Sequence, residues 1–481
     1  MQATAEPMRF GTVGAGLTEG HAREIFRRGE EAVVFALLQL AKQLADARGR
    51  GSPGAHPGAP GPSTPSGMRP VYTKPPRRTR KKRPGRQNGH PGARRERPDR
   101  VDRTLDHRLK CCPHCQGELH RCEQTRTRYT EDIPQDIQPV ITEHVIHRDY
   151  CPSCKKHVEP VVTDALPGST LGNRVLVLSA WLHYGLGNTL SQIVEVFGHH
   201  LHMALTPGGL VQMWQRLAEL LRAWYEQIQE EALKSAVLHG DETGWRVNGK
   251  THWLWCFSTV DLSFFMIDRC RGSPALLKFF KQEFAGTLVT DFWGAYNAVA
   301  CSKRQMCLVH LLRDLENVET YHPVNQDWPA FAKKLRRLIG DAIRLWKREA
   351  VPAAEYASRR SRLDQRLAEL IESPWDHTDA RRLIKRLRRH AGDLFTFLDE
   401  PGVPFDNNHA ERAIRPAVII RKNSQCNRSE RGANTQAVLM SVYRTLKQRG
   451  HPPIETIIHA IKIHLTTGQL PRLPAKVAAS G

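Results

Sequence analysis

Hydrophobic positions in the first half of the chain recur at helical spacing. In residues 31–48 the apolar side chains lie three and four positions apart, which predicts an amphipathic helix. This helix either packs against a partner helix or docks on its own domain, because the repeat is too short to prove a coiled coil. Residues 175–235 are also helical, and segments 189–197 and 207–221 flank a short break. That pair fits a DNA-reading helix-turn-helix and equally well an ordinary helical hairpin.

From residue 236 onward the pattern changes to short runs of β-branched, aromatic and aliphatic residues. Strands are predicted for residues 236–245, 251–260, 263–270, 287–292 and 305–310, and a helix for residues 274–284. Asn248-Gly249 supplies the two positive-φ residues of a tight type I′ turn between the first two strands. The order β-β-β-α-β places the first and fourth strands side by side. A basic helical insertion follows at about 325–400, before a last helical region.

Composition adds a charge argument to this pattern. The chain has 481 residues, with 71 Lys and Arg against 49 Asp and Glu, a formal net charge of +22. Such an excess favours a polyanionic partner, nucleic acid first and an anionic membrane surface second. No run approaches the roughly 20 apolar residues of a membrane span, and the start lacks a signal region. We therefore expect a soluble cytoplasmic protein associated with the nucleoid.

A flexible linker and a basic arm precede the predicted domains. Residues 51–67 are rich in Gly, Pro, Ser and Ala, a composition that cannot bury a core. Residues 74–100 hold twelve Lys or Arg against two acids, so this arm is either a DNA-tracking segment or a solvated linker. The candidate DNA contacts in the arm are Arg77, Arg78, Arg80, Lys81, Lys82 and Arg83.

Two C-x-x-C pairs predict a structural zinc ribbon. Cys112-Pro-His-Cys115 and Cys151-Pro-Ser-Cys154 each direct two thiolates toward one tetrahedral centre. Cys111 and Cys122 are spare candidates. A redox dithiol is the competing interpretation, although a single pair would suffice for that. Because the protein would supply all four zinc ligands, we expect a structural or DNA-positioning role without catalysis by zinc.

Three acids are candidates for binding divalent metal ions. Asp241 ends the first strand, Asp291 ends the fourth, and Glu411 lies in DNNHAERAIRP, where Asn407, Glu411 and Arg415 recur every four residues. Glu242 should point to the opposite face from Asp241, because side chains alternate along a strand. Taken singly, each acid is more often a helix cap or a surface salt bridge. Together, two Asp and one Glu suit two Mg²⁺ or Mn²⁺ ions about 3.5 to 4 Å apart.

The whole set of motifs resembles the insertion-sequence-66 family of transposases, members of the DDE superfamily. The resemblance rests on GRQNGHPG, the two C-x-x-C pairs, HGDETGW, LVTDFWGAY, CLVHLLRDL and NNHAERAIRP. It implies an α/β, RNase-H-like mixed-sheet catalytic core with a helical insertion, in which Asp241, Asp291 and Glu411 bind metal. Cys307-Leu-Val-His310 is similar to a motif of related enzymes, and a buried Cys with a strand-end His is the alternative. After Arg421-Lys422-Asn423 the chain departs from the family's usual aromatic and glycine residues.

This resemblance implies a bacterial DNA transposase. It would bind the terminal inverted repeats of its element, cleave each 3′ end with two Mg²⁺ ions, and transfer the freed 3′-hydroxyl to target DNA. The residues expected to hold phosphate oxygens beside the third acid are Arg412, Arg415, Arg421 and Lys422. Assembly on two ends implies a homo-oligomer, and accessory proteins of the same element are possible partners. The alternatives are a zinc-ribbon DNA-binding regulator without catalytic activity and a nuclease that cleaves without joining.

The predicted domains follow from these motifs and boundaries. They are an N-terminal helical segment (1–50), a linker and basic arm (51–105), a zinc ribbon (106–165), a helical region (170–235), a catalytic domain (236–450) and a C-terminal helix and tail (451–481).

Overall fold

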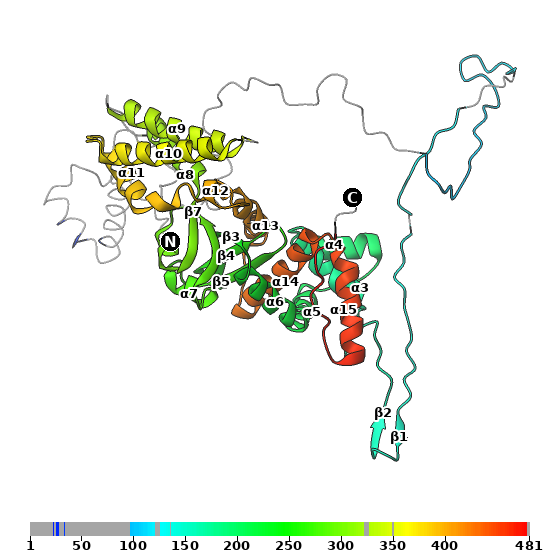
Figure 1. Ribbon diagram of the computed structural model, residues 1–481. Coiled ribbons are helices and arrows are strands. Elements are labelled where there is room, and N and C mark those ends of the chain that lie inside the picture. The colour runs from blue at the N-terminus through cyan, green and yellow to red at the C-terminus, as the bar shows by residue number, and fades with distance from the viewer. Residues whose placement is uncertain are drawn as a thin grey trace. The chain divides into compact units, whose positions relative to one another are not determined.

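The structure, a computed structural model, describes most of the chain after residue 96 (Figure 1). The described residues are 97–120, 126–134, 136–321, 327–348 and 351–478, with Arg23, Phe26, Arg27 and Val33. The predicted N-terminal helix apart from Val33, the linker, and the six arm residues Arg77 to Arg83 named above therefore lie outside the described residues, as does Cys122. The chain divides into two compact units, and the larger, which includes residues 144–194 and 205–481, carries the sheet.

The helical region before the sheet forms as predicted. Its helices are α3 (Asn173–Ala180), the π-helical turn η2 (Trp181–Gly185), α4 (Leu190–Leu201), α5 (Pro207–Leu220) and α6 (Arg222–Leu233). Thr206 caps the start of α5, because its Oγ1 accepts a hydrogen bond from the Gly209 N–H at 3.1 Å, and Pro207 is the first residue of the helix. Trp214 is buried and donates to Ser179 Oγ at 3.0 Å, which ties α5 to α3. DNA reading by α4 and α5 stays a prediction.

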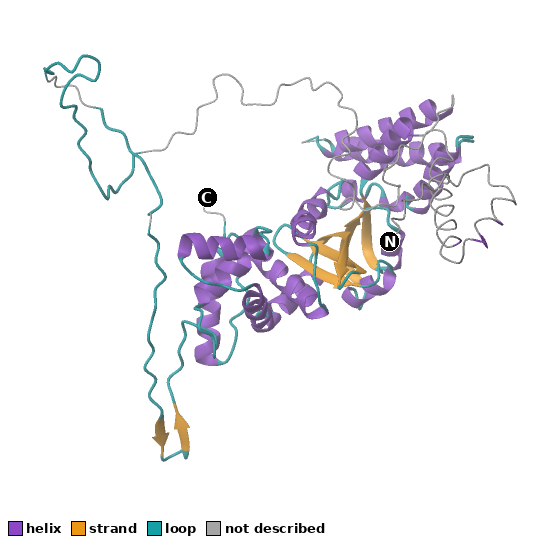
Figure 2. Ribbon diagram, turned by 180° about the vertical axis from the view of Figure 1, so that it is seen from behind, coloured by secondary structure: helices purple, strands orange, loops and turns teal. Residues whose placement is uncertain are grey.

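A five-stranded mixed sheet forms the core of the larger unit, and Figure 2 shows it flanked by helices. The strands are β3 (Val237–Val247), β4 (Lys250–Ser258), β5 (Ser263–Asp268), β6 (Phe284–Thr290) and β7 (Cys301–Met306), in the order β5-β4-β3-β6-β7. β3 pairs antiparallel with β4 and parallel with β6. The predicted neighbourhood of the first and fourth strands is therefore confirmed. Asn248 and Gly249 have φ of 49° and 71°, as the predicted hairpin turn requires.

The last predicted strand, residues 305–310, was placed too late in the sequence. β7 ends at Met306, and helix α8 (Leu308–Tyr321) begins two residues later. β7 is an edge strand whose first four residues are polar or small and partly exposed, so it lacks the apolar run that indicates a buried strand. His310 is consequently a residue of the first helical turn, not of a strand end.

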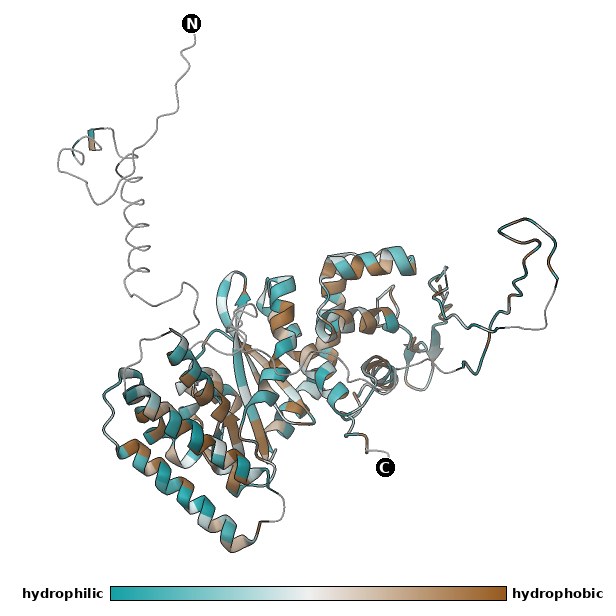
Figure 3. Cartoon of the chain, turned by 90° about the horizontal axis from the view of Figure 1, so that it is seen from above, coloured by the Kyte–Doolittle hydropathy of each residue, from teal (hydrophilic) through white to brown (hydrophobic). Residues whose placement is uncertain are grey.

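Helices connect and cover the strands. They are α7 (Ser273–Phe279), the 3-10 turn η3 (Gly294–Ala298), α9 (Asp327–Trp346), α10 (Ala353–Glu372), α11 (Thr378–Arg389), η4 (Ala391–Asp393), α12 (Thr396–Asp399), α13 (Asn408–Ser424), α14 (Glu430–Gln448) and α15 (Pro453–Thr467). The predicted insertion corresponds to α9, α10 and α11, whose apolar faces share one buried cluster with Val289 and Met306 of the sheet. In Figure 3 hydrophobic and hydrophilic residues alternate along these helices, as amphipathic packing requires.

A short hairpin of β1 (Asp149–Cys151) and β2 (Lys156–Val158) carries the second C-x-x-C pair. Among the described residues, no helix is both long enough and apolar enough to cross a membrane.

Candidate active site

Asp241 and Asp291 lie at matching positions of two adjacent parallel strands. Asp291 directly follows β6, whereas Asp241 lies inside β3, just past the residues that pair with β6. The prediction that Asp241 ends the first strand was wrong, because β3 continues to Val247 in its antiparallel pairing with β4. The register pairs Val237 with Thr287 and His239 with Val289, and its continuation by two residues sets Asp241 opposite Asp291. Asp241 is 3% exposed, and its Oδ1 accepts a hydrogen bond from the Glu242 N–H at 2.9 Å. Asp291 Oδ1 accepts from the Trp293 N–H at 2.9 Å, in a turn that fixes the carboxylate just past the strand end.

Glu411 reaches the same place from helix α13. It lies in the first turn of that helix, which packs against β3 and β4. Its carboxylate is held by Arg313 of α8 in a two-pronged ion pair, with Nη1–Oε1 at 3.0 Å and Nη2–Oε2 at 3.1 Å. His310 Nε2 lies 3.9 Å from the same Oε1. We call Asp241, Asp291 and Glu411 the acid site.

Burial and neighbouring carboxylates raise the pKa of both aspartates of the acid site. Burial raises the pKa of Asp241 well above its usual range, and the carboxylates of Glu242, Asp291 and Glu411 raise it further. Burial also raises the pKa of Asp291, although the Trp293 N–H and two arginines oppose that effect. Concentrated, poorly solvated negative charge of this kind favours bound cations, and oxygen ligands suit Mg²⁺ or Mn²⁺.

The acids nevertheless do not form a finished coordination shell. Within the part of the chain that the structure describes, no three His, Cys, Asp or Glu side chains are placed to hold one metal ion. The ion pair with Arg313 explains part of this, because both oxygens of Glu411 already have a partner. Cation binding would therefore require Arg313 to release Glu411.

Glu242 points away from the acid site, as strand alternation predicts. Its carboxylate is fully buried, accepts hydrogen bonds from Arg271 Nη2 at 3.2 Å, and accepts another from the Tyr296 hydroxyl at 3.0 Å. Burial raises the pKa of Glu242 to about 8, and the nearby Asp291 adds to the shift while Arg271 opposes it. Arg271 in turn lies over Trp293, with 3.7 Å from its guanidinium carbon to the ring centroid. Glu242 thus anchors a structural network beneath the site.

Asn407 attaches the start of α13 to the sheet through hydrogen bonds. Its side-chain amide donates to the Gly240 carbonyl at 2.8 Å, its Oδ1 lies 3.0 Å from His239 Nδ1, and its backbone N–H donates to Cys307 Sγ at 3.1 Å. Asn407 is 1% exposed, so these bonds form in the interior. The sequence pattern placed Asn407 on one helical face with Glu411, whereas the structure makes it the residue before the helix that sets the position of Glu411.

A cavity of about 290 Å³ opens beside Asp291. It is lined by Asp291, Phe292, Trp293, Gly294, His310, Asp314 and Arg386. Asp314 of α8 forms an ion pair with Arg386 of α11, which links this cavity to the helical insertion. Sequence reasoning missed Arg313, Asp314 and Arg386. The three-residue spacing of His310 and Arg313 does place one face of α8 toward Glu411.

The four predicted phosphate contacts on α13 differ in their surroundings. Arg412, Arg415 and Lys422 are exposed, whereas Arg421 is partly buried. Arg421 Nη1 donates to Thr243 Oγ1 at 2.9 Å and to the Gly244 carbonyl at 2.8 Å, so it braces α13 against β3. Contact of any of the four with DNA stays a prediction.

The segment that departs from the family's usual sequence joins α13 to α14 and packs on the β3–β4 hairpin. Gln425 and Cys426 have positive φ, and Asn427 Oδ1 accepts a hydrogen bond from Trp245 Nε1 at 2.7 Å. The Asn248 N–H also donates to the Asn427 carbonyl at 3.0 Å. The polar residues here therefore have a structural role at the end of β3.

In each C-x-x-C pair the backbone turns so that N–H groups point at the sulfur of the first cysteine, an arrangement that we call a thiol turn. Hydrogen bonds from the Cys115 N–H first, and then from the His114 N–H, lower the pKa of Cys112. The Cys154 N–H lowers the pKa of Cys151 in the same way. Thiols whose thiolate form is favoured by backbone N–H groups are suited to bind zinc, because thiolate is the ligand.

Comparisons with known proteins agree with these observations. The family described as "Transposase IS66 family" matches residues 168–435, more than half of the chain, and "zinc-finger binding domain of transposase IS66" matches residues 110–155. The two matches contain the acid site and all four cysteines. They define the class of the protein as a DNA-binding transposase with a zinc-finger segment. The chain belongs to the IS66 family of transposases.

Two relatives from Sinorhizobium fredii are similar to this chain. The uncharacterized protein y4qI is 24% identical over 241 residues, which span 43% of each chain. The uncharacterized protein y4jD is 22% identical over 396 residues, which span 74% of each chain. The chain thus matches less than half the length of the first relative and about three quarters of the second.

Proposed function

We propose that the acid site catalyses cleavage of the DNA strand at the ends of the element and transfer of that strand to target DNA. The observation that carries this proposal is the convergence of Asp241, Asp291 and Glu411 from β3, β6 and α13, with a raised pKa at Asp241. The sheet supports an RNase-H-like core, because β3 pairs antiparallel with β4 on one side and parallel with β6 on the other. We propose that the catalytic domain comprises residues 236–450, as the sequence predicts.

Both reactions exchange one phosphodiester bond for another bond to phosphorus. In cleavage, a water oxygen bonds to phosphorus and the element's 3′-oxygen leaves as a hydroxyl. In strand transfer, that 3′-oxygen bonds to a target phosphorus and the target's own 3′-oxygen leaves. Two Mg²⁺ or Mn²⁺ ions held by the acid site would supply activation of the attacking oxygen and stabilisation of the leaving one.

The chain's own residues prepare this chemistry. Asn407 fixes the start of α13, so that Glu411 faces the strand ends. Glu411 would have to leave Arg313 to hold a cation, and a DNA phosphate would offer the Arg313 guanidinium a new bidentate partner. Arg412 and Arg415 are exposed on α13 and supply positive charge for the DNA backbone.

The test uses the full chain, DNA carrying the element's inverted repeats, and the variants D241N, D291N and E411Q. We expect each to lose cleavage by about a thousandfold or more and to keep DNA binding. Glu369→Gln, at an exposed position on α10, serves as the matched control and keeps both. Acid variants that retain cleavage would refute the catalytic assignment, and a wild-type chain that binds this DNA without cleaving it would favour a regulator. Supplying pre-cleaved ends separates a transposase, which joins them to target, from a nuclease, which does not.

We also propose that Cys112, Cys115, Cys151 and Cys154 hold one structural zinc ion. The support is the zinc-finger match and the two thiol turns with lowered pKa at Cys112 and Cys151. Purified protein should contain about one zinc per chain by elemental analysis, as a tetrahedral Cys₄ site requires. C112S and C154S should each lose the metal, whereas C301S, outside the two pairs, should keep it. A zinc content unchanged in both variants would contradict the assignment.

A further inference from the structure

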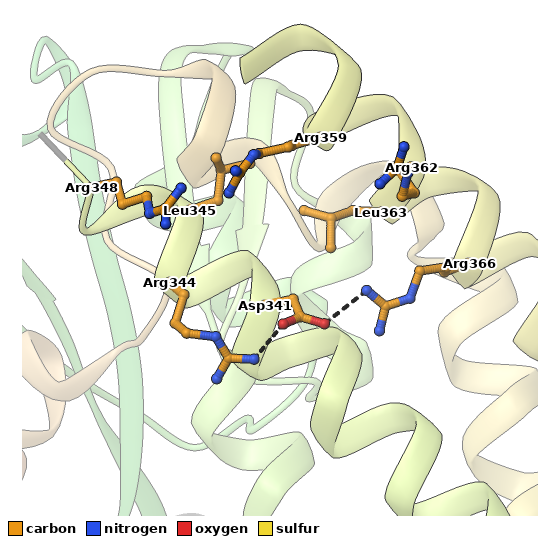
Figure 4. A pocket seen from close by; sticks show the side chains of 8 residues that line it. All are labelled: Asp341, Arg344, Leu345, Arg348, Arg359, Arg362, Leu363 and Arg366. Atoms are coloured by element: carbon orange, nitrogen blue, oxygen red, sulfur yellow. Dashed lines mark hydrogen bonds and ion pairs between the residues drawn. The ribbon is translucent and has the colours of Figure 1, made fainter. Parts of the chain in front are cut away.

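A positively charged cleft lies between helices α9 and α10 of the insertion. It encloses about 300 Å³ and is lined by Asp341, Arg344, Leu345, Arg348, Arg359, Arg362, Leu363 and Arg366. Asp341, Arg344 and Leu345 lie on one face of α9, and Arg348 follows two residues after the end of that helix. The residues from α10 are at positions i, i+3, i+4 and i+7, so one face of α10 meets this side of α9. Figure 4 shows the arginine side chains around the gap and the two leucines between them. We call this the arginine cleft.

The guanidinium groups of the arginine cleft are not neutralised by the acids beside them. Five arginines against one aspartate leave an excess of four positive charges among the lining residues. Asp341 is shared by Arg344 and by Arg366, the latter at 2.8 Å from Nη1 to Oδ2. Glu355 pairs with Arg359 and lies 4.0 Å from Arg348, which offsets one further charge. Like charges held this close repel one another, and an anionic ligand would relieve that repulsion.

The geometry favours a phosphate group. The planar guanidinium presents paired N–H donors that match phosphate oxygens, and arginine is the usual residue for such bidentate contacts. Asp341 holds two of the five guanidinium groups in fixed orientations, so part of the ordering cost precedes binding (Figure 4). Arg348 and Arg362 are exposed and come from opposite sides of the cleft.

We propose that the arginine cleft binds the sugar-phosphate backbone of DNA, as a contact separate from the acid site. This inference rests on the proposed function, because a transposase must hold DNA on both sides of the bond that it cuts. A phosphodiester every few ångströms supplies successive charges to a row of arginines, which a single free anion does not. The cleft carries no sequence information by itself, since phosphate contacts position DNA without reading bases.

The first test maps arginine modification by phenylglyoxal on the full chain, with and without a saturating DNA duplex of about three helical turns. We expect DNA to protect Arg348, Arg359 and Arg362, and to leave Arg337 modified, because Arg337 is exposed on α9 outside the cleft. No protection at saturation would overturn the proposal. Equal protection by inorganic phosphate would assign the cleft to a small anion, and stronger protection by polyglutamate would assign it to an acidic protein; each overturns it as well.

The second test compares two variants that lose the same charge. R348Q/R362Q should weaken duplex binding by about fivefold to tenfold and reduce the slope of log K against log salt by about one to two. K333Q/R337Q, at exposed positions on α9 outside the cleft, should change affinity by less than about twofold. Equal effects of the two variants would contradict a specific cleft. Neither test needs strand cleavage, so their failure leaves the catalytic proposal intact, and an inactive acid site leaves them readable.

Discussion

The acid site and the arginine cleft differ in how their charges come together. Asp241, Asp291 and Glu411 are far apart in the sequence and meet only because β3 pairs with β6 and α13 docks on the sheet. All the cleft residues except Arg348, which follows the end of α9, repeat at helical spacing on two consecutive helices. In the acid site Asp241 is buried, Asp291 and Glu411 are half-buried, and a long-range polar network holds them. The arginine cleft is open to solvent. The comparison indicates that catalytic geometry depends on the whole fold, while backbone binding needs only a local charge pattern.

The largest expected effect is on stability, from Asn407→Ala. This change removes both side-chain bonds of Asn407 and leaves the buried Gly240 carbonyl without one partner, so we expect a loss of about 2 to 4 kcal/mol in the free energy of unfolding. Chemical denaturation measures it.

Two control substitutions, one next to Asn407 and one in the arginine cleft, show how much of this stability loss is specific to the buried network. Asn408→Ala removes a bond to Asp406 at a half-exposed position and should cost less than about 1 kcal/mol. Arg362→Ala in the cleft should change stability by less than about 0.5 kcal/mol. A cost for Asn407→Ala as small as these would mean that Asn407 does not anchor α13.

A second prediction concerns Arg313, which competes with cations for Glu411. Arg313→Gln should raise the affinity for Mn²⁺ by about fivefold to tenfold, because it frees both carboxylate oxygens. Titration of Mn²⁺ followed by electron paramagnetic resonance measures this. Arg336→Gln breaks a similar bidentate pair with Glu319, at 2.6 Å, and should leave the affinity unchanged. A weaker affinity in Arg313→Gln would show instead that Arg313 prepares Glu411 for metal.

The third prediction is that the acid site lowers stability in the absence of metal. Asp241→Asn removes one of several mutually repelling, buried carboxyl groups and should raise the free energy of unfolding by about 1 kcal/mol in chelator. Asp376→Asn, at an exposed position, should have no measurable effect. Thermal unfolding with and without Mn²⁺ reports both values, and Mn²⁺ should stabilise only chains with Asp241. A destabilised Asp241→Asn would mean that this carboxylate is structurally required.

Much of the sheet was predictable because its strands are apolar and buried. The β3–β4 hairpin was located by Asn248-Gly249, and the opposite orientation of Glu242 followed from strand alternation. β7 was misplaced because an edge strand with exposed polar residues lacks the hydrophobic signal, while the apolar start of α8 resembles one.

The candidate acids were predictable from their positions, but their supporting contacts were not. Asn407 bonds to residues 167 and 168 positions away, and Arg313 pairs with Glu411 98 positions away. No local spacing reveals such partners, because only tertiary packing sets which helix face meets the strand ends. The arginine cleft is the reverse case, since its helical spacing is visible in the sequence and only the pairing of α9 with α10 is not.

The central claim is that Asp241, Asp291 and Glu411 together bind divalent cations. The most direct test is electron paramagnetic resonance of Mn²⁺ added to the full chain and to D241N/D291N/E411Q, each with a DNA duplex present. We predict that the wild-type chain removes Mn²⁺ from solution at sites that Mg²⁺ can compete for, and that the triple variant lacks those sites. Equal Mn²⁺ binding by a correctly folded triple variant would contradict the claim.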